Sequence, residues 1–348
     1  MRIGILTGGG DCPGLNAVIR GIVIQGKREG YEIIGFKDGW LGVLENSWEK
    51  LTEEKVEDIA REGGTILGTS RTNPLKEERG IEKIKDTLKN ASIDALIAIG
   101  GDDTLGVANK LHQEGIKAIG VPKTIDNDLS ATDYTFGFDT AVNIAVEAID
   151  RLHTTAKSHH RVLIVEIMGR HAGWIALEAG IGGGAHIILI PEAPFDIEEV
   201  CQTLIKRKKE GKNYSIVAVA EGAKAAKGSK FLTREVVKEE KVDAFGNIYL
   251  GGIARVLEKE IAKRTGIETR SVVLGHLQRG GRPSAFDRFL ATRFGLKAIE
   301  MVKENKFGQM ASLRGTEIVS VPLEEAVGKR KYVPVKLYEE TAKVLWGK

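Results

Sequence analysis

The sequence predicts an α/β fold with mostly parallel sheets, and three observations lead to this prediction. Short apolar runs alternate along the chain with amphipathic stretches of helical period, as in βαβ units whose sheet is buried on both faces. Several apolar runs end in turns rich in glycine or aspartate. The length of 348 residues exceeds the roughly 250–300 residues that one core usually supports. We therefore expect two lobes.

The apolar runs give the strand predictions, and the amphipathic stretches between them are predicted as helices. The expected strands are Ile3–Thr7, Glu32–Phe36, Ala95–Ile99, Ala118–Val121, Val162–Ile167, His186–Ile190, Ile216–Ala220 and Val272–Leu274. In open parallel sheets, ligands bind at the carboxyl ends of strands. The Lys- and Glu-rich segment Gly222–Ile248 carries few core signals and is predicted as a surface insertion of the second lobe.

The composition excludes several classes of function. A net charge of +3, with Lys and Arg scattered along the chain, is too small for a nucleic-acid footprint. Cys12 and Cys201 are far apart and lack zinc-ligand spacing, so neither a disulfide framework nor a structural metal site is indicated. The N-terminal residues lack the pattern of a secretory signal, and no apolar run reaches the roughly 18–20 residues of a membrane span. We expect a cytoplasmic protein that binds small anions.

Two glycine-rich turns follow predicted strands. The first, Gly8–Asp11, precedes a helical run from Leu15; its backbone could approach a phosphate at a helix start, or simply pack tightly. It is neither a Walker A loop nor a G-x-G-x-x-G fingerprint. The second, Gly100–Thr104, adds Asp102 and Asp103. Such carboxylates suit Mg²⁺ beside phosphates, and helix N-capping is the alternative.

The third turn, Thr124–Asp128, is the most specific. Asp126 and Asp128 stand two residues apart, and paired acids beside a phosphate cradle suit phosphoryl transfer to an alcohol. One carboxylate accepts the hydroxyl proton, and the other orients groups or binds metal. A surface turn rich in Asp and Asn is the alternative.

Cationic partners follow later strands. A bidentate arginine suits a sugar phosphate, and a carboxylate suits sugar hydroxyls. These residues are Arg161, Met168-Gly169-Arg170, Glu221, Arg270 and His276-Leu277-Gln278-Arg279.

Six ordered motifs resemble the 6-phosphofructokinase family and cover nearly the whole chain: TGGGDCPGLNAVIRG, GGDDTLGVA, PKTIDND, VEIMGRHAGWIAL, PEAPF and LGHLQRGGRPSAFDR. The resemblance implies two Rossmann-like, three-layer lobes with the active site in the cleft between them. Residues 1–137 plus about 278–327 would bind the phosphoryl donor and Mg²⁺. Residues 138–277 plus about 328–348 would bind fructose 6-phosphate and carry the insertion near 222–248. A homodimer or homotetramer with shared active sites is also implied.

The resemblance also implies roles for individual residues. Gly10 and Thr104 would contact the donor, Asp102 would hold Mg²⁺, and Arg71 would lie near the transferring phosphoryl group. Asp126 would accept the proton of the sugar 1-hydroxyl, supported by Thr124 and Asp128. The sugar-binding set would be Thr124, Ile125, Asp126, Met168, Gly169, Arg170, Glu221, His276, Leu277, Gln278 and Arg279, with Arg161 and Arg270 supplied by an adjacent subunit.

The sequence departs from the ATP-using members of the family at the donor site. Those enzymes typically carry glycine at the positions of Asp103 and Lys123; some of them also carry lysine at the second position, so the pair is the stronger signal. The Asp103 carboxylate would fill the space of a nucleotide α-phosphate, and Lys123 can offer its ammonium to pyrophosphate or to Asp103. Pyrophosphate is therefore the predicted donor, and an ATP-dependent or dual-donor enzyme is the alternative. A catalytically silent regulatory subunit is a third interpretation, but the acids Asp102, Asp126 and Asp128 are all present.

Regulation is a second departure. In the ATP-using bacterial enzymes, a basic interface pocket binds phosphorylated effectors. Here the apparent counterparts of its basic residues are Ile24, Glu53 and His153, although Arg20 remains. A pocket with fewer cations holds phosphorylated effectors poorly, so we expect weak or absent allosteric control.

Overall fold

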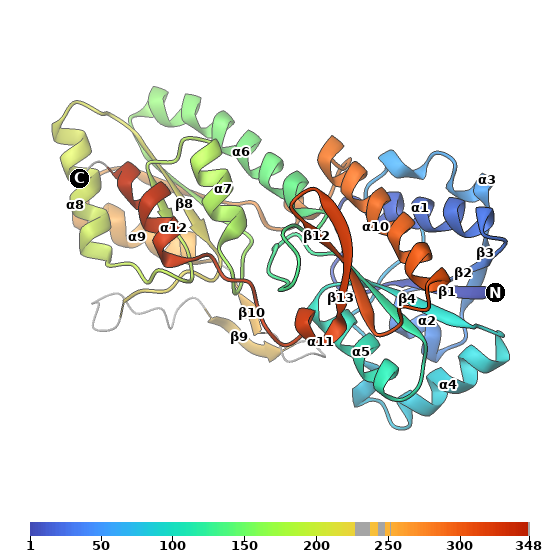
Figure 1. Ribbon diagram of the computed structural model, residues 1–348. Coiled ribbons are helices and arrows are strands. Elements are labelled where there is room, and N and C mark those ends of the chain that lie inside the picture. The colour runs from blue at the N-terminus through green and yellow to red at the C-terminus, as the bar shows by residue number, and fades with distance from the viewer. Residues whose placement is uncertain (227–236, 243–247, 251, 347–348) are drawn as a thin grey trace.

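The computed structural model describes residues 1–226, 237–242, 248–250 and 252–346. The strands in these ranges form a seven-stranded sheet, a four-stranded sheet and a two-stranded hairpin. Figure 1 shows the two larger sheets side by side, each covered by helices. The predicted α/β class with mostly parallel sheets is confirmed.

The first sheet has the strand order β13-β12-β5-β4-β1-β2-β3. Its five inner strands run parallel, and the edge strands β3 and β13 pair antiparallel with their neighbours. The bounds are β1 Arg2–Thr7, β2 Glu32–Phe36, β3 Trp48–Leu51, β4 Ala95–Gly100, β5 Ala118–Pro122, β12 Gln309–Arg314 and β13 Glu317–Pro322. Every residue of β4 is buried, as expected for a central strand covered on both faces.

Helices cover both faces of this sheet. One face packs against α1 (Leu15–Arg28) and α10 (Ala285–Lys303), which share a core cluster with inward residues of β1, β4 and β5. The alternate residues of the same strands pack against α2, α4, α5 and α11. Their bounds are α2 Trp40–Leu44, α4 Gly80–Asn90, α5 Asp102–Gln113 and α11 Leu323–Ala326.

The second sheet has the order β11-β6-β8-β7 and is parallel throughout. Its bounds are β6 Val162–Ile167, β7 Ile187–Leu189, β8 Ser215–Ala220 and β11 Thr269–Val273. Helices α6 (Phe138–His159) and α7 (Trp174–Gly182) cover one face, and α8 (Ile197–Lys209) and α9 (Ile253–Thr265) cover the other. The hairpin joins β9 (Val237–Val242) to β10 (Ile248–Leu250).

The chain crosses between the lobes three times: before α6, between β11 and α10, and after α11. Helix α6 contributes to a core cluster that also contains α1 and α10, so one apolar core continues from lobe to lobe. The segment after α11 crosses from the first lobe to α12 (Val335–Thr341) on the second, as the red ribbon in Figure 1 shows. The remaining short elements are α3 Glu53–Val56 and the 3₁₀ helices Ile59–Arg61, Pro74–Lys76, Gly275–Arg279 and Lys343–Trp346.

The strand predictions are largely confirmed, with one shift and several omissions. The strand expected at Val272–Leu274 is β11, which begins three residues earlier, at Thr269. The prediction began too late because the first residues of this strand are polar. Strands β3, β12 and β13 were missed, since two lie at sheet edges and all three carry polar residues. The predicted insertion Gly222–Ile248 includes β9, but its residues 227–236 and 243–247 lie outside the described residues. The lobe boundaries stay predictions.

Candidate active site

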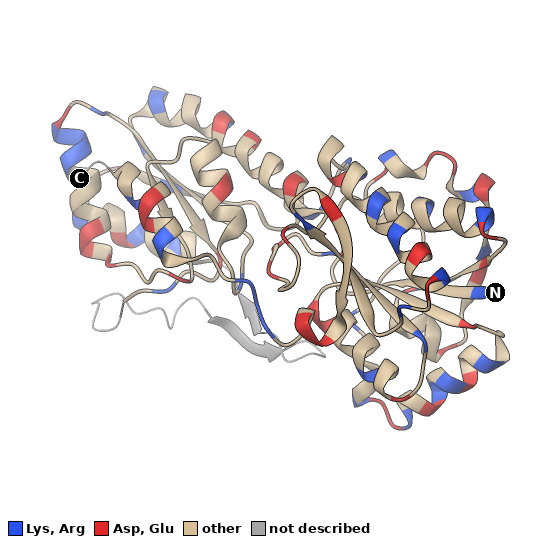
Figure 2. Ribbon diagram, in the orientation of Figure 1, with Lys and Arg blue, Asp and Glu red and all other residues tan. Residues whose placement is uncertain are grey.

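A cleft of about 240 Å³ lies where the carboxyl ends of both sheets meet. It is lined by Gly9, Gly10, Arg71, Gly101, Asp102, Asp103, Thr104, Lys123, Thr124, Asp126, Asp128, Met168, Arg170, His171, Glu221, His276, Arg279 and Arg330. Most of the residues singled out from the sequence are therefore brought together. Figure 2 shows Lys, Arg, Asp and Glu distributed over both lobes in the part of the chain that it colours.

The first turn, after β1, is packed tightly against its neighbours. The amide of Gly8 donates to Ile99 O at 2.9 Å and that of Gly9 to Ser70 O at 3.1 Å, with Gly9 at φ 81°. A Cβ atom at Gly10 would lie 2.9 Å from Cζ of Arg279. Glycine at position 10 thus lets the guanidinium of Arg279 approach the turn, and Arg279 Nη1 donates to Asp11 O at 3.1 Å.

The second turn places two carboxylates at the start of α5. Gly101 is the N-cap residue and makes no side-chain capping bond, so Asp102 and Asp103 are the first residues of the helix. The capping alternative is therefore wrong for both. Negative charge is favoured at a helix N-terminus, and both carboxylates line the cleft. Asp102 Oδ1 accepts a hydrogen bond from the amide of Gly328 at 3.0 Å.

Lys123 lies beneath the first two turns. Its side chain is buried, and its ammonium donates to Gly10 O, while its amide donates to Gly100 O at 2.9 Å. Burial lowers the pKa of Lys123, and the charge of Arg279 lowers it further; Asp11 and Asp126 oppose the shift. The side chain of Lys123 thus connects the first turn to the start of the third.

The third turn presents Asp126 and Asp128 to the cleft. The amide of Asp126 donates to Thr124 Oγ1 at 3.1 Å. Between the two acids, Asn127 adopts a left-handed conformation, φ 49°, and its Oδ1 accepts from the amide of Thr135 at 3.1 Å. Burial and the nearby charge of Asp126 raise the pKa of Asp128 to about 7, although Arg330, 3.9 Å away, opposes the shift.

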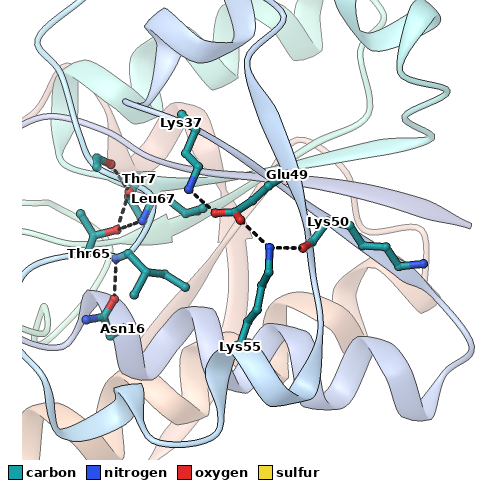
Figure 3. A network of polar contacts seen from close by, with 10 residues as sticks. Thr7, Asn16, Lys37, Glu49, Lys50, Lys55, Thr65 and Leu67 are labelled. Atoms are coloured by element: carbon teal, nitrogen blue, oxygen red, sulfur yellow. Dashed lines mark hydrogen bonds and ion pairs between the residues drawn. The ribbon is translucent and has the colours of Figure 1, made fainter.

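The loop that carries Arg71 is anchored to the first lobe by polar contacts, several of which are drawn in Figure 3. Thr7 Oγ1, at the end of β1, donates to Gly68 O at 2.8 Å and lies 3.0 Å from Thr65 Oγ1. Asn16 of α1 accepts from the amide of Ile66 at 2.9 Å. Nearer the cleft, Thr69 Oγ1 donates to Gly9 O at 2.7 Å. These contacts fix the approach of Arg71, which lines the cleft.

The second lobe contributes two strand ends. Met168 and Arg170 follow β6, and Glu221 follows β8, where its amide donates to Ile167 O at 2.8 Å. Burial raises the pKa of Glu221 to about 7, and the charge of Asp126 raises it further. Glu221 and Asp126 line the same cleft.

The 3₁₀ helix Gly275–Arg279 closes the cleft between the lobes. His276 and Arg279 line it. Gln278 is fully buried, and its Oε1 accepts from the amide of Met168 at 3.3 Å, whereas Leu277 is 70% exposed. Within one chain, Gln278 supports the backbone of Met168 and Leu277 lies on the surface. Neither lines the cleft, although the resemblance implied that both bind the sugar.

Four further predicted residues lie outside the cleft lining. Ile125 is 1% exposed and packs in the core, and Gly169 serves the backbone at φ 142°. Arg161 and Arg270 both form ion pairs with Glu268, at 3.0 and 2.9 Å. These two arginines are the ones expected to serve an adjacent subunit.

Sequence reasoning missed Gly9, Gly101, His171 and Arg330. The two glycines belong to turns already recognised. His171 follows Arg170, and burial, with the charges of Arg330, Arg170 and Lys224, lowers its pKa to about 4. Arg330 lies in the basic run Gly328-Lys329-Arg330-Lys331, far from any predicted strand. That run was the only available signal.

The described residues contain no cluster of three or more His, Cys, Asp or Glu side chains that could hold a metal ion. Mg²⁺ is commonly bound by one or two carboxylates together with substrate phosphates and waters, so Asp102 and its neighbours fit such a site. Among the same residues, no helix is both long and apolar enough to cross a membrane.

The fold and the cleft define a two-lobed α/β protein whose cleft is lined by glycine-rich turns, carboxylates and arginines. Residues 2–302 match the family described as Phosphofructokinase. The chain is 58% identical over the full length of both chains to the pyrophosphate–fructose 6-phosphate 1-phosphotransferase of Amycolatopsis methanolica. It is also 52% identical to the ATP-dependent 6-phosphofructokinase of Mycobacterium leprae, over 98% of this chain and 99% of that one.

A solved structure gives the same result for the fold. The phosphofructokinase of Pichia pastoris superposes with a TM-score of 0.80 at 32% identity, covering 93% of this chain but 35% of the longer yeast chain. The chain therefore belongs to the phosphofructokinase family.

Proposed function

We propose that this enzyme transfers a phosphoryl group from pyrophosphate to the 1-hydroxyl of fructose 6-phosphate, giving fructose 1,6-bisphosphate and orthophosphate. One observation carries the proposal: Asp126 lines one cleft together with Glu221 on the second lobe and with Asp103 and Lys123 on the first. An acid that can accept a hydroxyl proton is thus next to both a sugar-type and a phosphate-type surface. The relatives named for pyrophosphate support the choice of donor.

In the proposed mechanism, Asp126 accepts the proton of the sugar 1-hydroxyl as its oxygen attacks the terminal phosphorus of pyrophosphate. The bond to the leaving phosphate breaks in line with this attack, so no covalent phosphoenzyme is needed. Arg71 and the amides of the first turn stabilise the charge on the moving group. Thr124 and Asp128 hold the turn that carries Asp126.

Asp102 would hold Mg²⁺, which supplies positive charge to the donor oxygens when it is bound. Gly10 and Thr104 shape the donor side, since Thr104 packs directly against Gly8. On the sugar side, Glu221 and Met168 would contact the sugar, and Arg170, His276 and Arg279 would bind its anionic groups. Arg161 and Arg270 would complete the phosphate site of an adjacent subunit in a homodimer or homotetramer.

The donor site favours pyrophosphate for a physical reason. A carboxylate at position 103 adds negative charge where a nucleotide would place its α-phosphate, and the buried ammonium of Lys123 compensates charge at the same place. The M. leprae relative, named as ATP-dependent, keeps ATP as the second candidate donor. The reaction with pyrophosphate should run readily in both directions.

Control by phosphorylated effectors should be weak. Arg20, the remaining cation of the corresponding pocket, donates from Nε to Glu57 O at 3.1 Å. Glu53 is paired with Lys27, and His153 lies 2.7 Å from Gly183 O through Nε2. Strong inhibition of the enzyme by phosphoenolpyruvate would contradict this expectation.

The test is a comparison of donors. Purified enzyme with Mg²⁺ and fructose 6-phosphate is given pyrophosphate or ATP, and fructose 1,6-bisphosphate is measured. We expect product with pyrophosphate and little with ATP. Product with ATP alone would overturn the donor assignment and leave the acid and sugar sites standing, whereas no product with either donor would overturn the proposed function.

A further inference from the structure

The segment between α11 and α12 runs along the third turn and touches both lobes. Residues Leu129 and Arg330 form an isolated antiparallel bridge, and the amide of Lys331 donates to Asp128 O at 2.8 Å. The two neighbours face opposite ways. Arg330 lines the cleft, 3.9 Å from Asp128, and Lys331 reaches behind the turn.

The ammonium of Lys331 makes three hydrogen bonds behind the acid-bearing turn. It donates to Asn127 Oδ1 at 3.0 Å, to Thr132 O at 3.0 Å and to Asp133 O at 2.7 Å. A lysine has three N–H donors, so all are used. Asn127 lies between Asp126 and Asp128 and is held in the left-handed conformation, which costs free energy unless its surroundings fix it.

The same residue is fastened to the second lobe. The indole Nε1 of Trp174, at the start of α7, donates to Lys331 O at 2.8 Å, and the Lys331 ammonium lies 5.8 Å from the centre of that ring. Two residues on, the amide of Val333 donates to Glu192 Oε1 at 2.9 Å. Glu192 also accepts from the amide of Gly173, the residue before α7. Lys331 thus lies between the acid-bearing turn and the sugar lobe.

We propose that Lys331 is a positioning residue for phosphoryl transfer: its ammonium fixes the turn that carries Asp126 and Asp128, and its backbone ties that turn to the second lobe. The inference rests on the proposed function, because it assigns Lys331 an effect on the step in which Asp126 accepts a proton. Burial lowers the pKa of Lys331 to about 8, so the ammonium is mostly charged at pH 7.

The test variant is Lys331→Met, and the matched control is Lys343→Met. Lys343 also carries its ammonium over an indole, 3.5 Å from the ring centre of Trp346, but its ion-pair partner, 2.6 Å away, is Glu199 of α8 and not the acid-bearing turn. A displacement of about 1 Å at a reacting group can cost roughly 10²-fold in rate. We expect kcat of Lys331→Met to fall by about 30- to 100-fold, with both substrate KM values within about twofold.

A purely structural role is separated by how the rate is measured. Turnover is determined per folded enzyme, well below the unfolding temperature of each variant. A role in folding alone would lower the unfolding temperature and leave kcat near that of the wild type, and this result would overturn the proposal. The wild-type kcat with whichever donor is active is the reference, so a wrong donor assignment does not affect the comparison.

Two further measurements cover a variant that folds poorly or an enzyme with another activity. Trp174→Phe keeps an aromatic side chain but removes the N–H bond to Lys331 O together with the pyrrole part of the indole; we expect a loss of several-fold in kcat with unchanged KM. Amide hydrogen exchange at residues 126–135 reports the turn directly. It should be faster in Lys331→Met or Trp174→Phe than in Lys343→Met. Equal exchange in all three would contradict the proposal whatever the reaction is.

Discussion

The two sides of the cleft, one at the first sheet and one at the second, differ in how many of their predicted residues lie in the cleft of a single chain. On the edge of the first sheet, Asp102, Asp103, Lys123, Asp126 and Asp128 all lie in the cleft. On the edge of the second sheet, Arg170 and Glu221 lie there, but Arg161 and Arg270 are paired with Glu268 outside it. A turn that follows a strand is placed by that strand, whereas Arg161 precedes β6 and Arg270 lies within β11, away from the carboxyl ends of these strands. The donor edge is thus local, and we infer that the sugar edge is shared between subunits.

The largest effect is expected from Asp126→Asn, at the point where the two edges meet. General-base catalysis typically contributes about 10²–10⁴-fold, so kcat should fall by that factor while both KM values change little. Initial rates with fructose 6-phosphate and pyrophosphate measure it. Asp150→Asn, on an exposed position of α6, is the control and should be fully active. An active Asp126→Asn enzyme would remove the proton-accepting role from Asp126.

The donor edge is tested by Asp103→Gly, with Asp103→Asn as the matched variant that removes charge and keeps size. Interactions with charged groups are typically worth about 1.5–3 kcal/mol. We therefore expect the ratio of kcat/KM for pyrophosphate to that for ATP to fall by roughly 10- to 100-fold in Asp103→Gly. If Asp103→Asn gives the same fall, charge is the cause; if it does not, space is the cause. An unchanged ratio in both would show that position 103 does not select the donor.

The shared edge is tested by Arg161→Ala and Arg270→Ala. Loss of a charged contact to the sugar phosphate should raise the fructose 6-phosphate KM by roughly 10- to 100-fold, whereas Arg255→Ala, exposed on α9, should leave it unchanged. Mixing Arg161→Ala with Asp126→Asn under conditions that exchange subunits should restore activity, because some hybrid sites are complete. No restoration after exchange proven by mass spectrometry would argue that Arg161 acts within its own chain or not at all.

The smallest effect is expected on the thermal stability of a variant at Glu221, a buried carboxylate that the negative charge of Asp126 disfavours. The pKa of this carboxyl is raised to about 7 in the folded protein from its ordinary value near 4.5. The folded state therefore favours the protonated form, and stability is lost as the pH rises from about 4.5 through 7. Glu221→Gln should unfold at a higher temperature than the wild type at pH 8, by a few degrees, and show no such gain at pH 5. Equal differences at both pH values would mean that Glu221 is not strained by its charge.

The sequence was sufficient for the α/β class, for the central strands and for the three turns, because each depends on neighbouring residues. An apolar run such as Ala95–Gly100 and the glycines and acids after it are read together. Strands β3, β12 and β13 were not predicted, since they mix polar and apolar residues and lack the continuous apolar run of the buried parallel strands.

The same distinction explains the site residues that were missed. Arg330 and Lys331 contact the third turn although they lie about 200 residues further along the sequence, in the crossing segment after α11. No local sequence pattern predicts this contact. Gln278 looked like a ligand because of its position in a motif, but it is buried and supports Met168. Residue spacing in the sequence identifies a motif, but the packing in the folded protein decides which of its residues line the site and which support those that do.

The most direct test of the proposed reaction runs it backwards. Enzyme, Mg²⁺, fructose 1,6-bisphosphate and orthophosphate are combined without any nucleotide and followed by ³¹P NMR. The account predicts that pyrophosphate and fructose 6-phosphate appear together in equal amounts and that Asp126→Asn forms neither at a comparable rate. If pyrophosphate never appears, while the same enzyme makes fructose 1,6-bisphosphate from ATP, the assignment of pyrophosphate as donor is contradicted.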